Sequence, residues 1–237
     1  MKRPLLILAL TLFTYSHAQS QVLLSLIFGE KLNSDGIEFG LEGGYNWSTL
    51  TGLETSELRR SFNLGFYFDI RLKEPWYLYT GTLVKSGLGV ADLTANDLTR
   101  LGVTQRPEEG QYDQQINYFL VPVFMKYKFP SRFYLEAGPQ FGLRSKAFVE
   151  FESDAEDPKV VVRDTNKGDI RSIEAGFAGG FGYKFKPGPR GMSIGVKYYY
   201  GLTRVFEDFK SYNRGLFLKV NVPIGAGKKE DFEAKSN

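Results

Sequence analysis

Six segments of this chain alternate apolar and polar residues with a period of two, and this pattern limits the possible folds more than any other feature. The segments are 36–47, 61–72, 133–144, 173–185, 192–202 and 215–224. Because successive side chains of a strand point to opposite faces, each segment predicts a strand with one apolar and one polar face. Two less regular segments, 76–89 and 116–129, bring the expected number of strands to eight. Pro122 in the last of these predicts a bulge, since proline has no N–H for the ladder.

The connections between these segments alternate in length. Short turns are expected at 73–75, 130–132 and 186–191, and longer loops at 48–60, 90–115, 145–172 and 203–214. Short turns at one end and long loops at the other are typical of an up-and-down barrel in an outer membrane. An even number of strands would bring both termini to the short-turn side. We therefore predict an all-β, eight-stranded, antiparallel, up-and-down transmembrane β-barrel with a short N-terminal segment.

A soluble barrel with its apolar face turned inward would show the same alternation. Three features favour the membrane assignment. The polar face is rich in glycine, which weakens a solvated strand but leaves room for large neighbours inside a narrow barrel. Aromatic residues that could form two interfacial girdles gather near the strand ends: Trp47, Trp76, Tyr77, Tyr127, Phe129, Phe133, Tyr183 and Phe185. Segments of about 10 residues are also long enough to cross the hydrocarbon core.

The N-terminus has the three parts of a secretory signal peptide. Lys2 and Arg3 precede an apolar run at 5–13, and Ser16-His17-Ala18 supplies small residues around a cleavage point. We predict cleavage after Ala18. The domains expected are a signal peptide at 1–18, a leader at 19–35 that forms a short helix, a barrel at 36–227 and a charged tail at 228–237.

Charge and composition exclude several classes of protein. Lys and Arg total 30 against 27 Asp and Glu, without a basic cluster, which argues against nucleic-acid binding through bulk charge. There is no Cys, so disulfides and thiolate chemistry are excluded. The only His is His17, inside the predicted signal peptide. A serine nucleophile in the mature chain would therefore lack the usual imidazole base.

The segments that carry the alternation also resemble a known family. The relevant residues are Ile37-Glu38-Phe39-Gly40-Leu41-Glu42-Gly43-Gly44, Val121-Pro122-Val123 with Lys126-Tyr127-Lys128-Phe129, Phe133-Tyr134-Leu135-Glu136-Ala137-Gly138-Pro139, Tyr198-Tyr199-Tyr200-Gly201-Leu202-Thr203, and the leader 23–33. They resemble the outer-membrane β-barrel domain of porin-family and PorT-like proteins of Bacteroidota. The resemblance implies an architecture rather than an activity. The charged C-terminal tail departs from the terminal aromatic residue common in such barrels.

The polar faces of the expected strands carry acidic and basic residues together. They are Glu38, Glu42, Asp69, Arg71, Glu136, Arg144, Glu174, Lys184, Lys197 and Lys219. An eight-stranded barrel has room only for its own side chains, so we expect a buried network of ion pairs. Lys197 should face the lumen and pair with Glu174 or Glu136, while Val196 should face lipid. A polar path for protons or small ions is the alternative use of these residues.

The same residues suggest three other kinds of site. Glu38 with Glu42, or Glu136 with Glu174, could form an acid–base pair, but a packed lumen would not admit a sugar. The loop acids Glu150, Glu152, Asp154, Glu156 and Asp157 do not have EF-hand spacing. The glycines of 179–182 lie within a strand, where they cannot form a phosphate-binding loop. We predict no catalytic, cofactor-binding or metal-binding residue.

These observations predict a non-catalytic protein of the outer membrane with both termini in the periplasm. Its expected role is structural, surface-binding or accessory to an envelope or secretion assembly. The expected partners are outer-membrane lipid and other envelope or secretion proteins reached through the long loops, with no nucleic acid and no cofactor. The alternatives are a narrow channel for small solutes or ions, and an enzyme that cleaves outer-membrane lipid or peptides.

Overall fold

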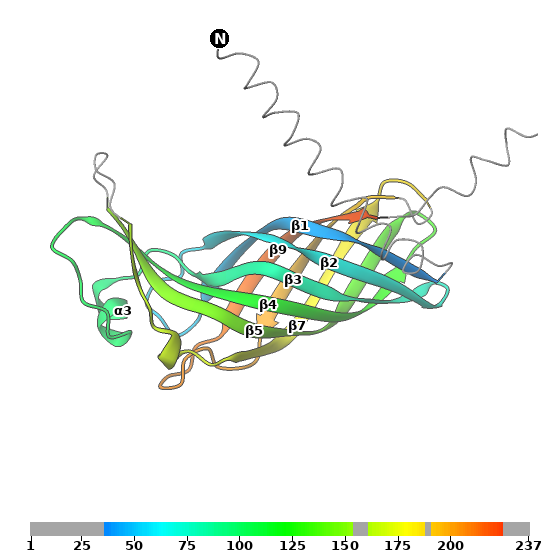
Figure 1. The fold of residues 1–237 in the computed structure, drawn as a ribbon. Helices are drawn as coiled ribbons and strands as arrows, with labels where there is room; N and C mark the ends of the chain where they lie inside the picture. The colour runs from blue at the N-terminus through cyan, green and yellow to red at the C-terminus, as the bar shows by residue number, and fades with distance from the viewer. Residues whose placement is uncertain (1–35, 154–160, 188–190, 225–237) are drawn as a thin grey trace, which may run out of the picture.

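A computed structural model describes residues 36–153, 161–187 and 191–224, and in this part of the chain the fold is almost entirely β (Figure 1). The strands are β1 (Ile37–Leu50), β2 (Arg59–Lys73), β3 (Trp76–Val90), β4 (Gly110–Lys128), β5 (Phe133–Ser153), β6 (Val161–Asp164), β7 (Ile173–Lys184), β8 (Ser193–Gly201) and β9 (Asn213–Pro223). A short helix, α3 (Ala95–Arg100), and a 3₁₀ turn, η2 (Lys167–Asp169), lie in the connections. The signal peptide, the leader and the charged tail predicted above lie outside the described residues.

Eight of the nine strands close into a ring. Each strand pairs antiparallel with its neighbours in the order β4-β3-β2-β1-β9-β8-β7-β5, and β4 also pairs with β5. β1 and β9 join the two ends of the chain, with Gly40 opposite Pro223 and Leu50 opposite Asn213. The ring leaves no strand edge open to lipid, which a membrane requires. The predicted eight-stranded, antiparallel, up-and-down barrel is confirmed, and the short β6 is an addition that pairs with β5 alone.

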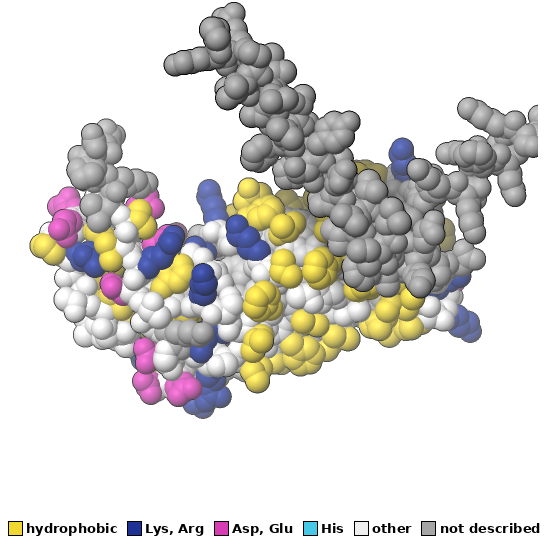
Figure 2. All heavy atoms as spheres, viewed as in Figure 1, with side chains coloured by type: hydrophobic (Ala, Val, Ile, Leu, Met, Phe, Trp, Pro, Cys, Tyr) yellow, Lys and Arg dark blue, Asp and Glu magenta, His cyan; other side chains and the backbone are white. Residues whose placement is uncertain are grey.

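The alternation of faces is also as predicted. On β5, Leu135 and Phe141 are about half exposed, while Glu136 and Gln140 are buried. On β8, Tyr198 is exposed and Lys197 is fully buried. The apolar residues therefore point outward and the polar residues inward. On the face of the barrel in view, Figure 2 shows these outward apolar side chains gathered between the two ends of the barrel, and we call them the apolar band.

Glycines on the inner face accommodate tyrosine rings. A Cβ atom at Gly182 or Gly195 would overlap the Tyr134 side chain, and one at Gly40 would overlap Tyr67. The sequence predicted that these glycines leave space for large charged side chains inside the barrel. At these positions the large neighbours are tyrosines instead.

The two ends of the barrel differ as expected. The connections at 74–75 and 129–132, and the described residues 185–187 and 191–192 between β7 and β8, lie at one end together with the start of β1 and the end of β9. We call this the turn end. The connections at 51–58, 91–109 and 202–212, and the described residues 161–172 between β5 and β7, lie at the other end, the loop end. Both described chain ends are thus on the side of the short turns.

Two of the expected loops are shorter than predicted. The segments 90–115 and 145–172 were expected to be loops, but β4 begins at Gly110 and β5 continues to Ser153. The two strands stay paired beyond the other strands of the ring (Figure 1). Their inner faces there bury Tyr112, Val149 and Phe151 together with the polar Gln114 and Ser153, and the rings of Tyr112 and Phe151 lie 4.8 Å apart. This packing explains why the ladder continues where the residues are otherwise polar.

The bulge expected at Pro122 is absent from the described ladder. Pro122 pairs with Gln140 in the same register as Tyr118 with Arg144 and Met125 with Ala137. The register shifts instead between Asn117 and Tyr118. A second shift, between Leu83 and Ser86 on β3, accounts for the irregular alternation of 76–89.

The aromatic residues near the strand ends form one clear girdle, at the turn end. Its ring pairs, 4.8 to 5.9 Å apart, are Trp76–Tyr127, Tyr127–Phe129, Phe133–Tyr183 and Tyr183–Phe185. Tyr77 does not belong to it, since Tyr77 lies on the inner-facing alternation of β3 and Lys128 stacks on its ring. Trp47 lies at the loop-end boundary of the apolar band, where it pairs with Arg60 in the β1–β2 ladder.

Candidate functional site: a packed lumen beneath a folded loop cap

The turn-end half of the lumen holds a network of charged side chains. Lys126 Nζ lies 3.3 Å from Asp69 and 3.6 Å from Glu136, and Lys128 Nζ lies 2.8 Å from Asp69. Lys219 forms a further ion pair with Glu136. The side chains of Lys126, Asp69, Glu136 and Lys219 are all at most 3% exposed. Such buried charges are stable only when they are paired, and the predicted ion-pair network is present.

Lys197 is the most deeply buried cation of this network. Its partner is Glu42 on β1, at 3.6 Å, and not Glu174 or Glu136 as expected. The Tyr79 hydroxyl donates to the same carboxylate. The ammonium group also lies 5.4 Å from the Phe124 ring and 5.1 Å from the Phe217 ring. The predicted inward position of Lys197 is correct, but the strand that supplies its carboxylate is different.

The network reaches the mouth of the barrel at the turn end. Lys184 Nζ lies 2.6 Å from Glu38, which also accepts a hydrogen bond from the Tyr67 hydroxyl. A cavity of about 190 Å³ opens there, lined by these residues and by basic side chains that include Lys126, Lys128 and Arg132. Arg71, expected in the lumen, is instead exposed and pairs with Glu74 of the adjacent turn.

The middle of the lumen is polar but contains fewer charges. Glu174 is 1% exposed and accepts hydrogen bonds from Tyr199, at 2.8 Å, and Thr203, at 3.2 Å. Gln140 and Tyr199 are fully buried. Side chains therefore fill the cross-section at this level as well. Within the described residues, the amide of Gln140 has no hydrogen-bond partner at either its nitrogen or its oxygen.

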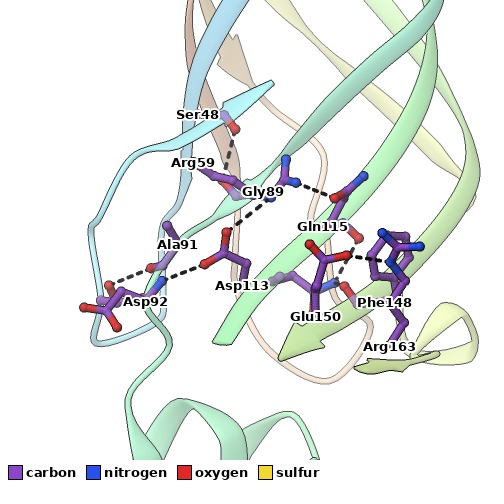
Figure 3. Close-up of polar contacts among 12 residues, drawn as sticks. Ser48, Arg59, Gly89, Ala91, Asp92, Asp113, Gln115, Phe148, Glu150 and Arg163 are labelled. Carbon is purple, nitrogen blue, oxygen red and sulfur yellow. Dashed lines mark hydrogen bonds and ion pairs between the residues drawn. The ribbon is translucent and has the colours of Figure 1, made fainter. Parts of the chain in front are cut away.

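A polar network joins the strands at the loop-end rim (Figure 3). Arg59 of β2 contacts Gln115 and lies 3.8 Å from Asp113 on β4. Asp113 also accepts a hydrogen bond from the Asp92 amide, at 3.1 Å. These residues lie beyond the apolar band. Burial raises the pKa of the Asp113 carboxyl, and the Asp92 amide and the Arg59 guanidinium oppose that rise. Arg163 pairs with Glu150, which ties β6 to β5.

The loops above this rim are folded into a cap. The α3 helix begins with a capping box, in which Thr94 accepts from the Asp97 amide and Asp97 accepts from the Thr94 amide. Asp97 is buried and also accepts from the amides of Glu54, at 2.7 Å, and Thr55, at 3.1 Å. Each buried N–H bonded to a charged acceptor stabilises such an arrangement. The β1–β2 loop is thereby fixed to the β3–β4 loop.

An apolar cluster fills the space beneath the cap. It includes Leu93 and Leu98 from the β3–β4 connection, and Ile170, Val205 and Phe206 from the later loops. Ile170 and Phe206 form a β-bridge, and Arg100 stacks on Phe209 at 4.6 Å. All four connections of the loop end thus contact one another or the same core. A cavity of about 510 Å³ lies at the outer edge of the cap, between 101–107 and 164–169.

Several lumen residues were missed by reasoning from sequence. Lys126 and Lys128 are central to the network, and the rings of Tyr79 and Tyr134 lie against the Lys126 ammonium, at 4.1 and 4.4 Å. The alternation of β4 could have identified both lysines, since both lie on its inner face. The converse error is Arg144, which lies at the rim and donates to Ile170 and Ser172 rather than to a lumen carboxylate.

The two carboxylates of each candidate acid–base pair have different bonding partners. Glu38 and Glu42 have separate lysine partners, and Glu136 pairs with lysines whereas Glu174 is bonded to hydroxyls. In the described part of the chain, no three His, Cys, Asp or Glu residues are grouped as metal ligands. Helices long and apolar enough to cross a membrane are likewise absent from the described residues.

The closed ring, its outward apolar band and its charged interior define a transmembrane β-barrel. Comparison with family models gives the same class: the chain belongs to the outer membrane protein beta-barrel domain family, whose model matches residues 18–207. The protein is therefore an outer-membrane β-barrel protein. A comparison with curated proteins found no match.

Solved barrels with similar folds share little sequence with this chain. The attachment invasion locus protein Ail of Yersinia pestis is 14% identical with a TM-score of 0.41, and the match covers 81% of this chain and 100% of Ail. Neisserial surface protein A is 12% identical with a TM-score of 0.39, covering 79% of this chain and 99% of that protein. The outer membrane protein OprG of Pseudomonas aeruginosa is 12% identical with a TM-score of 0.36, covering 79% and 93%.

Proposed function

We propose that this protein is a non-catalytic outer-membrane barrel whose working part is the folded loop cap, presented at the cell surface with both termini in the periplasm. Its role is structural, surface-binding or accessory to an envelope or secretion assembly. The resemblance to porin-family and PorT-like proteins of Bacteroidota supports the accessory role. The cap would contact partner proteins, and the apolar band would contact lipid.

The observation that carries this proposal is the contrast between the two parts of the molecule. The lumen is filled by its own side chains, with Lys197 and Gln140 completely buried. The cap is ordered by specific contacts such as those of Asp97, and it bears an outer cavity. A barrel that served mainly as a pore would need a continuous aqueous path. A barrel that displays a binding surface needs rigid loops, and these contacts supply them.

Crosslinking in intact cells tests the proposal. A photoreactive amino acid is placed at Thr104 or Gln105, both exposed beside the outer cavity. The matched control is Lys73, the exposed last residue of β2 beside a short turn. We expect specific adducts from the cap positions that form with intact cells and disappear after the surface is shaved with protease. Adducts from Lys73 alone would place the working surface on the periplasmic side.

A narrow path for protons or small ions is the second candidate. The observation that favours it is the buried polar layer around Gln140 and Glu174, which lies between the rim and the charged network. Single-channel recording on the purified protein in a planar bilayer separates the two proposals. The packed lumen predicts no discrete conductance steps. Steps that change when Lys197 is replaced by Met would favour the channel.

The third hypothesis is an enzyme acting on outer-membrane lipid or peptides. Incubation of the folded protein with labelled lipid or peptide tests it directly. We expect no turnover above that of heat-unfolded protein. Turnover that is lost in a Glu174→Gln variant would support catalysis in the lumen.

A further inference from the structure

Six basic side chains border the apolar band on its loop side. They are Arg60, Lys85, Lys146, Arg171, Arg204 and Arg214, all on outward or exposed positions, and we call them the basic ring. Figure 2 shows Lys and Arg side chains along this margin of the band, with acidic side chains farther out toward the loop end. The ring was not singled out by the sequence, because its members are scattered over 155 positions of the chain.

The members are distributed around the circumference. Arg60 lies on β2, Lys85 on β3, Lys146 on β5 and Arg214 on β9. Arg171 precedes β7 and donates its backbone N–H to Val205, which places it beside Arg204 after β8. In the strand order of the ring, the members lie on or beside six of the eight strands, and β1 and β4 carry none of them.

Four of the six members lie at the same height above the apolar band. The last outward apolar residue lies two positions away in four cases, and the pairs are Phe62 with Arg60, Ile173 with Arg171, Leu202 with Arg204 and Leu216 with Arg214. Two strand residues span about 7 Å, or about 5 Å along the normal of a tilted strand. The headgroup region on each side of the hydrocarbon core is about 5–7 Å thick. The charges thus lie at the depth of lipid headgroups.

Among the described residues, Arg214 is the one member of the ring whose side chain has polar partners in the protein. No member forms an ion pair with another residue in the described ranges. Lys85 lies over the Phe62 ring, at 5.7 Å, and Arg214 over the Tyr200 ring, at 3.5 Å. Nη1 of Arg214 donates to the carbonyls of Gly201, at 2.8 Å, and Asn213, at 2.7 Å, and its other guanidinium N–H groups are the ones left for phosphate. Both aromatic partners face outward at the edge of the band, which directs these cations along the lipid boundary rather than into the lumen. Lys and Arg at this depth attract anionic headgroups, and arginine in particular binds phosphate with two parallel N–H groups.

We propose that the basic ring binds the phosphate groups of the phosphorylated glycolipid of the outer leaflet. The proposal rests on the loop end facing outward, as in the proposed function. It assigns these residues to lipid rather than to the protein partner of the cap. The ring would fix the depth of the barrel and collect a shell of glycolipid around the base of the cap.

Titration of lipid into the folded full-length protein in zwitterionic detergent, followed by native mass spectrometry, tests the ring. The ring variant is K146Q/R171Q/R204Q, and the matched control K73Q/K186Q/K210Q removes three exposed charges elsewhere. We expect wild type and control to bind lipid A alike and the ring variant to bind about 100-fold more weakly. Wild type should also lose most of its binding in about 0.5 M salt, a measurement that needs no variant.

Three results would overturn the proposal. Equal binding of lipid A by the ring variant and the control would show that the ring is not the site. Equal binding of phosphatidylglycerol and lipid A by wild type would reject the choice of glycolipid. Binding of lipid A that is insensitive to salt would reject recognition through phosphate. A separate experiment tests whether the loop end faces outward. If it faces the periplasm, surface protease on intact cells leaves the loop end intact, while lipid binding in detergent is unchanged.

Discussion

Two neighbouring residues of β8 test both faces of the barrel wall. Val196 points outward in the middle of the strand, between Phe181 of β7 and Leu218 of β9. Lys197 points inward and is fully buried. Arginine at position 196 would place a charge in hydrocarbon and should lower the free energy of unfolding by about 2–4 kcal/mol.

Lys197→Met should be harmful for a different reason. It leaves the buried Glu42 carboxylate without the lysine that lies 3.6 Å away, although the Tyr79 hydroxyl still donates to it. Removing one member of a buried ion pair costs about 3–5 kcal/mol. We expect a value near the lower limit, because the hydrogen bond to Glu42 remains and because Met can pack beside two phenylalanine rings. Adding Glu42→Gln removes the stranded charge and should recover about 1–2 kcal/mol.

The assay is urea unfolding in phosphatidylcholine vesicles, followed by the fluorescence of Trp47 and Trp76, the two tryptophans of the chain. Glu174→Gln is the matched control, since Glu174 lies elsewhere in the lumen and is bonded to hydroxyls. Combined with Lys197→Met it should be additive within about 0.5 kcal/mol. A neutral Val196→Arg would show that this face is not in a bilayer. Recovery by Glu174→Gln instead of Glu42→Gln would refute the pairing across the lumen.

The remaining predictions concern location, topology and the cap. The mature chain should begin at Gln19, fractionate with outer membrane and migrate differently in detergent gels before and after heating; retention of Met1 or recovery from the soluble periplasm would contradict this. External protease on intact cells should cut within 145–172 and spare the turn at 73–75, and the reverse pattern would invert the topology. Asp97→Ala should destabilise the cap by about 2–3 kcal/mol, because three backbone N–H groups lose their acceptor, and limited proteolysis of the cap loops should accelerate relative to Thr99→Ala, which removes only an exposed hydroxyl.

The loops show where reasoning from sequence was least accurate. The segment 90–115 was expected to be an irregular loop, yet it contains α3 and the first residues of β4. The helix starts at a Thr94–Asp97 capping box, a short pattern that could have been found in the sequence. The extension of β4 and β5 depends on packing between Tyr112 and Phe151, which are far apart in the chain. Such long-range contacts leave only a weak signal in a single sequence.

The alternation of apolar and polar residues by itself determined the eight strands of the ring, the barrel they form and the faces on which Val196 and Lys197 lie. The reason is that the period of a strand is two and hydrocarbon accepts only apolar side chains. Only the tertiary structure decided which charges meet. Lys197 of β8 reaches Glu42 of β1 across β9, and Lys126 joins Asp69 of β2 to Glu136 of β5. These pairs depend on how far the strands are staggered when the ring closes, a quantity that no local pattern encodes. The basic ring has the same origin, since its members become neighbours only when the sheet is rolled into a barrel.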